Sequence, residues 1–439
     1  MKTYKTKNKT KLALFAGATA LAALAPQVHA QSSDALIDKL VDKGVLTVDE
    51  AKDLRTEADK DFNTAMQAKT GMPDYVTGYK ISGDVRGRYE NFSYDAASPI
   101  SRDRFRYRIR AGITVYMKDD VEAGFRITSD EAKGSYGGGD PISGNQTMTD
   151  NGSKKLVYID QAYGKWSPLH TAGWNGSVIL GKMENPFVYS DLVFDPDYTP
   201  EGAALQLSYD INDRQKVSFN GGGFALYEIS GSYYDSYMFG GQARLDSKWT
   251  DKLTTSVGAG YLCLANDAKL TTAAVPDSNS GNTRVGGVLV HDYTPFVLDA
   301  SATYNLDSIP FYSGPFPIKV AGDYINNSSV NKNGDGFSAG ITLGKAGKKG
   351  LWELSYRFKY LKSDAWYEEL VDSDFGANTS GSYKSGTNVK GHVVKVVYNL
   401  TDSLSLASTL FITSLVSKPT AMKSHDDTSR LQVDANWKF

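Results

Sequence analysis

The sequence predicts an all-β chain: a transmembrane antiparallel β-barrel of about 16 strands, preceded by a short periplasmic helical segment. From about Tyr79 onward, apolar and polar residues alternate with a period of two, as in strands with one apolar and one polar face. Short turns alternate with long loops rich in Gly, Asn, Ser and Asp, and the last strand alternates up to Phe439. A closed barrel with an even number of strands accounts for all three observations.

Residues 1–30 predict a cleaved signal peptide. A lysine-rich start is followed by the apolar run Leu12–Ala25 and by Val28-His29-Ala30, which has the small residues of a cleavage site. The apolar run is shorter than the roughly 20 residues that a membrane-spanning helix needs. We therefore expect export, cleavage after Ala30 and localisation in the cell outer membrane.

Charge and cysteine content exclude several classes of protein. The chain carries 48 basic and 50 acidic residues, and removal of the five signal lysines lowers the basic count further. This excess of acidic residues argues against a nucleic-acid partner. Cys263 is the single cysteine, which excludes an intrachain disulfide and a Cys-ligated metal site. We expect no cofactor and no metal.

Residues 31–70 predict a periplasmic arm of two helices. Apolar residues recur at helical spacing at Leu36, Ile37, Leu40 and Val41. Gly44 suits the end of the first helix, and Thr47 with Glu50 forms a capping box for the second. Gly71, Met72 and Pro73 break the pattern, so we place the barrel domain at 71–439.

The first three barrel strands carry a ladder of arginines on their polar face. Arginine facing lipid costs roughly 2–4 kcal/mol at the midplane of a bilayer, so these side chains are expected to face the lumen. The predicted pore-lining residues are Arg86, Arg88, Arg104, Arg106, Arg108, Arg110 and Arg126. Rings of arginine attract anions. Neutralisation of the ladder by Asp84, Glu90 and Asp103 is the alternative.

Six long loops, 92–101, 129–154, 184–200, 266–282, 363–388 and 414–428, are expected on the outer side. The third is acidic, and its candidate constriction residues are Glu184, Asp191, Asp195, Asp197 and Glu201. An acidic loop opposite a basic wall would create a transverse field across a narrow pore. An ordinary solvated loop, or a calcium site made by Asp195, Asp197 and Glu201, are the alternatives.

The last predicted strand has the pattern expected of a strand that spans a membrane. Leu431, Val433, Ala435, Trp437 and Phe439 lie on one face, and Gln432, Asp434, Asn436 and Lys438 on the other. Trp437 and Phe439 fit an interfacial aromatic girdle and resemble the signal that outer-membrane assembly machinery reads. Outer-membrane lipids and the barrel assembly machinery are therefore expected partners.

Four motifs carry a family resemblance: Gly181–Phe187, Asp195–Gly202, Trp366-Tyr367-Glu368-Glu369 and Asp372-Ser373-Asp374-Phe375. With them, the segment from about Tyr79 to Phe439 resembles the Putative porin family of Gram-negative outer membranes. The resemblance implies a sixteen-strand barrel and a homotrimer. In trimeric general porins, the loop equivalent to 184–200 folds into the barrel and faces an arginine cluster. A helical arm before the barrel is also similar to phosphate-selective porins, but their lysine-rich pore motif has no match here.

Three functions remain open at this stage. The first is passive diffusion of small hydrophilic solutes, with anions preferred because of the arginines. The second is a structural or adhesive barrel whose loops bind partners. The third is a barrel hydrolase using Ser424-His425-Asp426-Asp427. Adjacent residues of one loop cannot all converge on one substrate atom, so we expect no catalytic site.

Overall fold

The computed structural model describes residues 51, 54, 71–94, 101–133, 137–276, 278–379, 382–418 and 427–439. Gly78–Phe439 form one compact unit, which is described here by itself. The predicted signal peptide lies outside the described residues, as does the helical arm apart from Ala51 and Leu54, which are helical. Among the described residues, no helix has the length and apolar character needed to cross a membrane.

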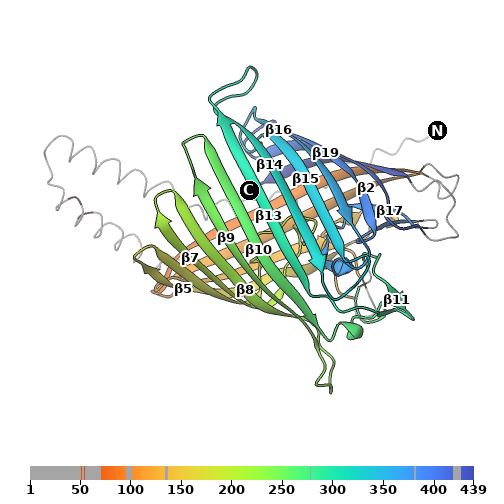
Figure 1. Ribbon diagram of the computed structural model, residues 1–439. Helices are drawn as coiled ribbons and strands as arrows, with labels where there is room; N and C mark the ends of the chain where they lie inside the picture. Colours follow the sequence, from red (N-terminus) through yellow and green to blue (C-terminus); the bar gives the residue numbers. More distant parts are fainter. Residues whose placement is uncertain are drawn as a thin grey trace, which may run out of the picture. The chain divides into compact units, whose positions relative to one another are not determined.

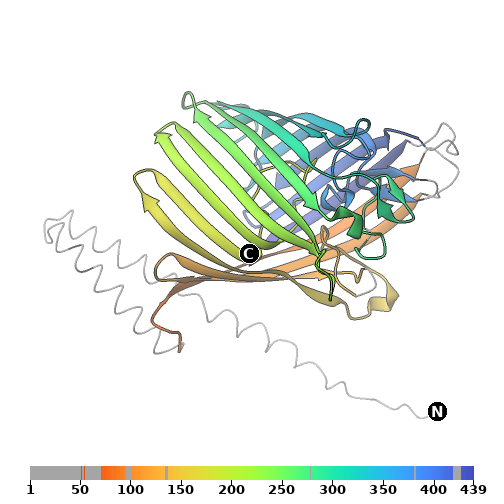
Figure 2. The ribbon, with the colours of Figure 1, turned by 60° about the horizontal axis from the view of Figure 1, so that its bottom comes forward.

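Sixteen long antiparallel strands close into a barrel (Figures 1 and 2), which confirms the predicted fold class. Each pairs with the next long strand along the chain, and β21 pairs with β1 to close the ring. The strands are β1 (Val76–Tyr94), β2 (Arg102–Met117), β3 (Val121–Asp130), β5 (Leu156–Thr171), β6 (Trp174–Lys182), β7 (Glu201–Asn212), β8 (Gln215–Tyr227), β9 (Ser236–Lys248), β10 (Leu253–Ala265), β13 (Pro295–Leu306), β14 (Phe316–Asn327), β15 (Asp335–Gly344), β16 (Trp352–Leu361), β19 (Val389–Asn399), β20 (Leu404–Leu415) and β21 (Thr428–Lys438).

The two ends of the barrel differ. The connections at one end, called the turn end, are mostly short. In the β2–β3 turn, Asp119 and Asp120 adopt φ values of 62° and 58°, which Asp tolerates better than most residues. The opposite end, here the loop end, carries β11 and β17 at the right of Figure 1. Its four largest described loops are L2 (131–155), L3 (183–200), L5 (266–294) and L7 (362–388).

Short elements lie within these loops. L2 contains β4 (Gln146–Thr147), which pairs with β2, and the 3₁₀ turn η2 (Asp150–Gly152). L5 contains η3 (Asp267–Lys269) and the hairpin of β11 (Arg284–Val285) and β12 (Val288–Leu289). L7 contains η4 (Glu368–Leu370) and the hairpin of β17 (Gly376–Asn378) and β18 (Tyr383–Ser385).

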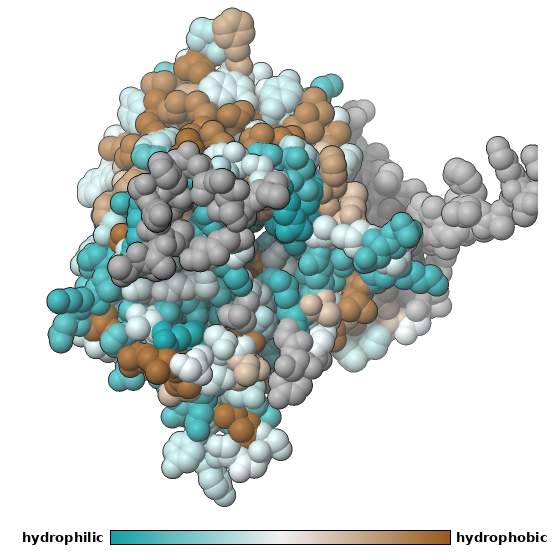
Figure 3. All heavy atoms as spheres, turned by 90° about the vertical axis from the view of Figure 1, so that its right-hand side faces the viewer, coloured by the Kyte–Doolittle hydropathy of each residue, from teal (hydrophilic) through white to brown (hydrophobic). Residues whose placement is uncertain are grey.

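The barrel wall is apolar outside and polar inside. On β2, Phe105 is 57% exposed and Ile109 43%, whereas Arg106 and Arg108 between them are buried. Trp437 of β21 and Phe439, which directly follows that strand, are exposed and alternate with polar residues. Viewed onto the loop end, Figure 3 shows hydrophilic residues around a central hollow and apolar residues toward the outer flank. An apolar exterior is what a lipid environment requires of a barrel.

L7 corrects one expectation about the loops. It was expected on the outer side with the others, but it folds back into the barrel, where Trp366, Leu370 and Phe375 are buried. The apolar core inside the barrel combines residues of L3 and L5, such as Phe194 and Tyr293, with Trp366 and with wall residues. The physical reason is burial: aromatic and aliphatic side chains in a loop gain free energy when another apolar surface covers them.

Candidate functional site

The predicted arginine ladder lies on the inner face of β1, β2 and β3. Arg86 and Arg88 alternate with outward residues on β1, and Arg104, Arg106, Arg108 and Arg110 do the same on β2. Arg126 faces inward from β3 and pairs with Asp160 of β5. Because β1 and β2 are neighbours, their guanidinium groups form one basic wall.

Two carboxylates enclose the turn-end part of this wall. Asp84 of β1 accepts from Arg108 Nη2 at 3.0 Å and from Arg110 Nε at 2.6 Å. Asp197 of L3 accepts from the Nη1 atoms of the same two arginines at 2.7 and 2.9 Å. Burial alone would raise the pKa of Asp197, but Arg108 and Arg110 hold it below its usual value. L3 is thereby fixed against the arginine wall.

A second cluster lies nearer the loop end. Arg88 binds Asp434 of β21 through two bonds of 2.7 and 2.9 Å and lies 3.1 Å from Asp374 of L7. Glu90 pairs with Arg104 and, at 2.5 Å, with Arg430, which also binds Asp374 at 2.8 Å. Burial opposes ionisation of Asp374, but Arg430 and Arg88 lower its pKa well below the usual range. L7 therefore binds the same basic wall as L3.

A third cluster, on β16, was not predicted from the sequence. Lys359 is buried and lies 2.7 Å from Asp372 of L7 and 3.3 Å from Asp191 of L3. Arg357 binds the same Asp191 at 2.9 Å and Asp323 of β14 at 2.7 Å. The available signal was the inward parity of Arg357 and Lys359 on a strongly alternating strand.

L3 and L7 are joined directly to one another. Asp195 N donates to Leu370 O at 2.8 Å, and Ser373 N donates to the Asp195 carboxylate at 2.8 Å. Asp372 N donates to Asp191 O at 3.3 Å. Burial, followed by the neighbouring carboxylates of Asp197 and Asp372, raises the pKa of Asp195 well above its usual value. The two loops form one layer across the lumen.

The remaining sequence-predicted residues lie apart from this layer. Glu184 is exposed, and Glu201 is the first residue of β7, where it pairs with Lys182 at 3.1 Å. Within the described part of the chain, no group of three His, Cys, Asp or Glu side chains could hold a metal ion. Ser424, His425 and Asp426, considered above for hydrolysis, lie outside the described residues.

Arg86 and Arg106 differ from the rest of the ladder. Arg86 Nη2 donates to Asn145 Oδ1 at 2.6 Å, and Arg106 Nη2 donates to Asn145 O at 2.8 Å. Asn145 belongs to L2, which was not predicted to contact the arginines. Three loops, rather than the one predicted, thus reach the arginine wall.

Three cavities follow this wall from one end of the barrel to the other. The loop-side cavity is about 390 Å³, the side cavity about 320 Å³ and the turn-side cavity about 640 Å³. The first two share Asp140 and Ser143, and the last two share Arg108, Arg110 and Asp197 in their linings. Ser373 and Asp374 line both the loop-side and the turn-side cavities. The three cavities therefore lie beside the layer formed by L3 and L7.

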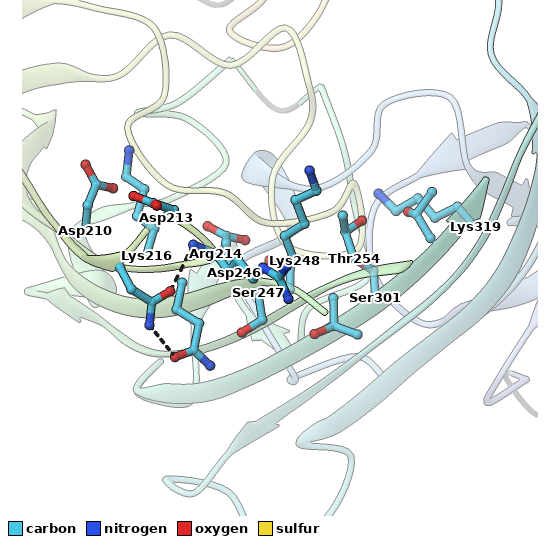
Figure 4. Close-up of a pocket in the computed structure, with 15 residues that line it drawn as sticks. Asp210, Asp213, Arg214, Lys216, Asp246, Ser247, Lys248, Thr254, Ser301 and Lys319 are labelled. Atoms are coloured by element: carbon cyan, nitrogen blue, oxygen red, sulfur yellow. Dashed lines mark hydrogen bonds between the residues drawn. The ribbon is translucent and has the colours of Figure 1, made fainter. Parts of the chain in front are cut away.

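A further cavity of about 380 Å³ lies at the turn end, against β7 to β10, β13 and β14. Lys216, Lys248 and Lys319 point to the same side of the sheet in this cavity (Figure 4). Asp210 and Asp246 lie among them, so the wall here is of mixed charge.

Comparisons with known proteins agree with this architecture. The family model described as Putative porin matches residues 98–284 and 299–439. A high-pH structure of OprB from Pseudomonas putida has a similar fold, with a TM-score of 0.51 at 12% identity, covering 82% of this chain and 94% of that chain. Comparison of the sequence with curated proteins gives no match.

Two other solved structures cover 82% of this chain at 11% identity. They are a loop L8 deletion mutant of OmpT from Vibrio cholerae, with a TM-score of 0.43 and 99% of that chain covered, and a triple mutant of the Rhodopseudomonas blastica porin, with a TM-score of 0.41 and 100% covered.

Proposed function

Since the chain belongs to the Putative porin family, whose model covers most of it, we propose that it is an outer-membrane porin through which small hydrophilic solutes diffuse passively. One observation carries this proposal: cavities with shared charged linings follow the arginine wall from the loop end to the turn end. Charged groups that face a lumen keep it wet and admit polar solutes in preference to apolar ones.

The charge of the loop-side cavity supports a preference for anions. Its lining contains six basic residues, Arg102, Arg104, Arg106, Lys133, Lys384 and Arg430, against three acidic ones, Glu131, Asp140 and Asp374. A cavity of one predominant sign raises the local concentration of the opposite ion. Deeper in the barrel, Asp197 of L3 and Asp374 of L7 pair directly with the arginines, so they neutralise that part of the wall.

Conductance in a planar bilayer tests the pore itself. Purified protein is expected to give stepwise open-channel currents, and the absence of any current from folded protein would overturn the proposal. Reversal potential in a potassium chloride gradient then tests ion preference. Lys133→Glu with Lys384→Glu should shift it toward cations, since both lysines line the loop-side cavity. An unchanged reversal potential would show that this cavity does not set the preference.

A second function is favoured by the apolar core inside the barrel. L3, L5 and L7 fill part of the lumen with side chains such as Phe194, Tyr293 and Trp366. A closed structural barrel whose loops bind partners would use the same packing. Folded protein that never conducts but binds a partner through its loops would support this alternative.

Further proposals follow from the sequence. We propose that the chain is cleaved after Ala30 and that residues 31–70 form a periplasmic helical arm. We also propose that the barrel assembly machinery recognises Trp437 and Phe439, and that the protein forms a homotrimer in the outer membrane. Mass spectrometry of the exported protein would identify its first residue. A change in gel mobility between unheated and heated samples would report the trimer.

A further inference from the structure

We propose that Arg86 and Arg106 form a binding site for a small oxyanion where L2 reaches the arginine wall. The inference rests on the proposed pore, because the ligand would meet the site in passage. Both guanidinium groups converge on one neutral residue, Asn145, from neighbouring strands. The site is distinct from the clusters that fix L3 and L7.

Asn145 is held in place from its own loop. It is buried, and its Nδ2 donates to Ser143 Oγ at 3.0 Å. The next residue, Gln146, belongs to β4, which pairs with Tyr107 of β2. The oxygen atoms that meet Arg86 and Arg106 are therefore positioned by the fold.

The two arginines lack the charge partner that their neighbours have. Arg88, Arg104, Arg108, Arg110, Arg126 and Arg430 each pair with at least one carboxylate. In the part of the chain that the structure describes, no carboxylate lies within 4.0 Å of the guanidinium groups of Arg86 or Arg106. The Nε atoms of both are buried without a hydrogen-bond partner, as are those of Arg108 and Arg430, so the missing carboxylate is what distinguishes the pair. A buried cation without a carboxylate in direct contact is unfavourable, so an anion bound between the two guanidinium groups would stabilise them.

Comparison with the adjacent pair shows what is missing. Asp197 bridges Arg108 and Arg110 with two carboxylate oxygens. Asn145 bridges Arg86 and Arg106 in the same manner, but with a carboxamide oxygen and a backbone carbonyl. In both cases two oxygens of one residue join two arginines, but at Asn145 the negative charge is absent. An oxyanion from solution can supply it.

The residues of this site line two different cavities. Arg86 and Asn145 line the turn-side cavity, whereas Arg106 lines the loop-side cavity. The site thus stands between the two cavities. Guanidinium groups form paired hydrogen bonds with carboxylate and phosphate groups, which makes oxyanions better ligands than chloride. Binding in a pore must remain weak enough for release, so we expect concentration-dependent block rather than permanent closure.

The test uses the full-length protein in planar bilayers with chloride as the carrier and inorganic phosphate as the probe. Phosphate should reduce chloride current in the native protein. Asn145→Asp adds the missing charge with almost no change in size, and should weaken phosphate block by about tenfold or more. Asn305→Asp adds the same charge on β13 and should leave the block unchanged.

Arg106→Gln provides a second variant in case Asn145→Asp does not fold. It removes one guanidinium and should also weaken the block, whereas Arg214→Gln, in the turn between β7 and β8, should not. Channels that conduct but show no phosphate block, or variants and controls that change it equally, would overturn the site and leave the porin intact. No current from the native protein would instead overturn the proposed function.

Discussion

Gln242 of β9 clamps Val188 of L3 through both of its amide atoms. Val188 N donates to Gln242 Oε1 at 2.9 Å, and Gln242 Nε2 donates to Val188 O at 2.8 Å. Arg244, two residues along the same strand, donates to the same carbonyl at 2.9 Å. L3 is therefore fixed on two sides, to β9 by these backbone contacts and to the arginine wall by Asp197.

Gln242→Leu keeps the side-chain volume and removes both amide hydrogen bonds. Each contributes about 1 kcal/mol, so local opening around Val188 should become at least tenfold more frequent. Amide hydrogen exchange at Val188 measures this directly, and current noise should rise with it. Gln206→Leu is the control, because Gln206 reaches L3 only through a 3.5 Å contact with Pro186. Equal exchange in both variants would contradict the clamp.

Gly240 provides the space in which Phe187 of L3 sits. A Cβ atom at Gly240 would lie 2.6 Å from Phe187 Cζ and 2.7 Å from Leu262 Cδ2. Gly240→Ala should therefore displace L3 and cost about 1–3 kcal/mol, as overpacked cores do. The measurement is the midpoint of urea unfolding in detergent, together with channel conductance.

The matched control for that variant is the next residue. A Cβ atom at Gly241 would lie at least 3.7 Å from the ring of Phe219, which is an ordinary contact. Gly241→Ala should leave both the urea midpoint and the conductance unchanged. Equal losses at the two positions would mean that the sheet, rather than the contact with Phe187, requires glycine.

The sequence was sufficient to predict the barrel, because the alternation of apolar and polar residues is a local property of each strand. Partners of the arginines were harder to predict. Arg88 pairs with Asp434, 346 residues away along the chain, through a closure that only the assembled ring creates. Asp84 and Glu90, named as neutralising residues, do contact the ladder, whereas Asp103 binds the hydroxyl of Tyr89.

The inward folding of L7 was not predicted, although its sequence contains a signal. Trp366, Leu370 and Phe375 are large apolar residues in a loop otherwise rich in Asp, Ser and Gly. Such residues are rarely left in water when a cavity can cover them. Because most residues of the loop are polar, its composition predicts that it lies in solvent. The sequence of L2 carries a weaker signal of its contact with the arginines, since Asn145 makes this contact through one carboxamide and one backbone carbonyl.

Acidification should act on the contact between L3 and L7 in two stages. Burial and nearby carboxylates raise the pKa of Asp195 above its unfolded value, so its protonation favours the folded loops as pH falls toward that value. The pKa of Asp374 is lowered, so its stabilising ion pairs with Arg430 and Arg88 are present above about pH 4 and are lost in stronger acid. Current fluctuations should decrease on mild acidification and increase in strong acid.

Asp195→Asn separates the two stages. Without the ionisable group, the decrease in fluctuations on mild acidification should disappear, whereas the increase in strong acid should remain because Asp374 is unchanged. Recordings in a stepwise pH series from alkaline solution into strong acid cover both stages. A native channel whose fluctuations do not vary with pH would show that this contact does not control the current.

Gly83 of β1 contacts Phe439 where β1 and β21 close the barrel. The two residues exchange backbone hydrogen bonds of 2.9 and 3.1 Å. A Cβ atom at Gly83 would lie 2.5 Å from Phe439 Cζ and 2.3 Å from Arg110 O. Gly83→Ala should therefore impair pairing of β1 with its neighbours and lower the fraction of folded, heat-modifiable protein in outer-membrane preparations.

Gly87 is the control on the same face of the same strand, because a Cβ atom there meets no atom within 4 Å. Gly87→Ala should fold as the native protein does. Adding Phe439→Ala to Gly83→Ala relieves the contact with the ring but leaves the contact with Arg110 O, so recovery should be partial. Full recovery would assign the whole effect to the ring. No recovery would assign it to the backbone of β2, and the ring would then have no part in closure.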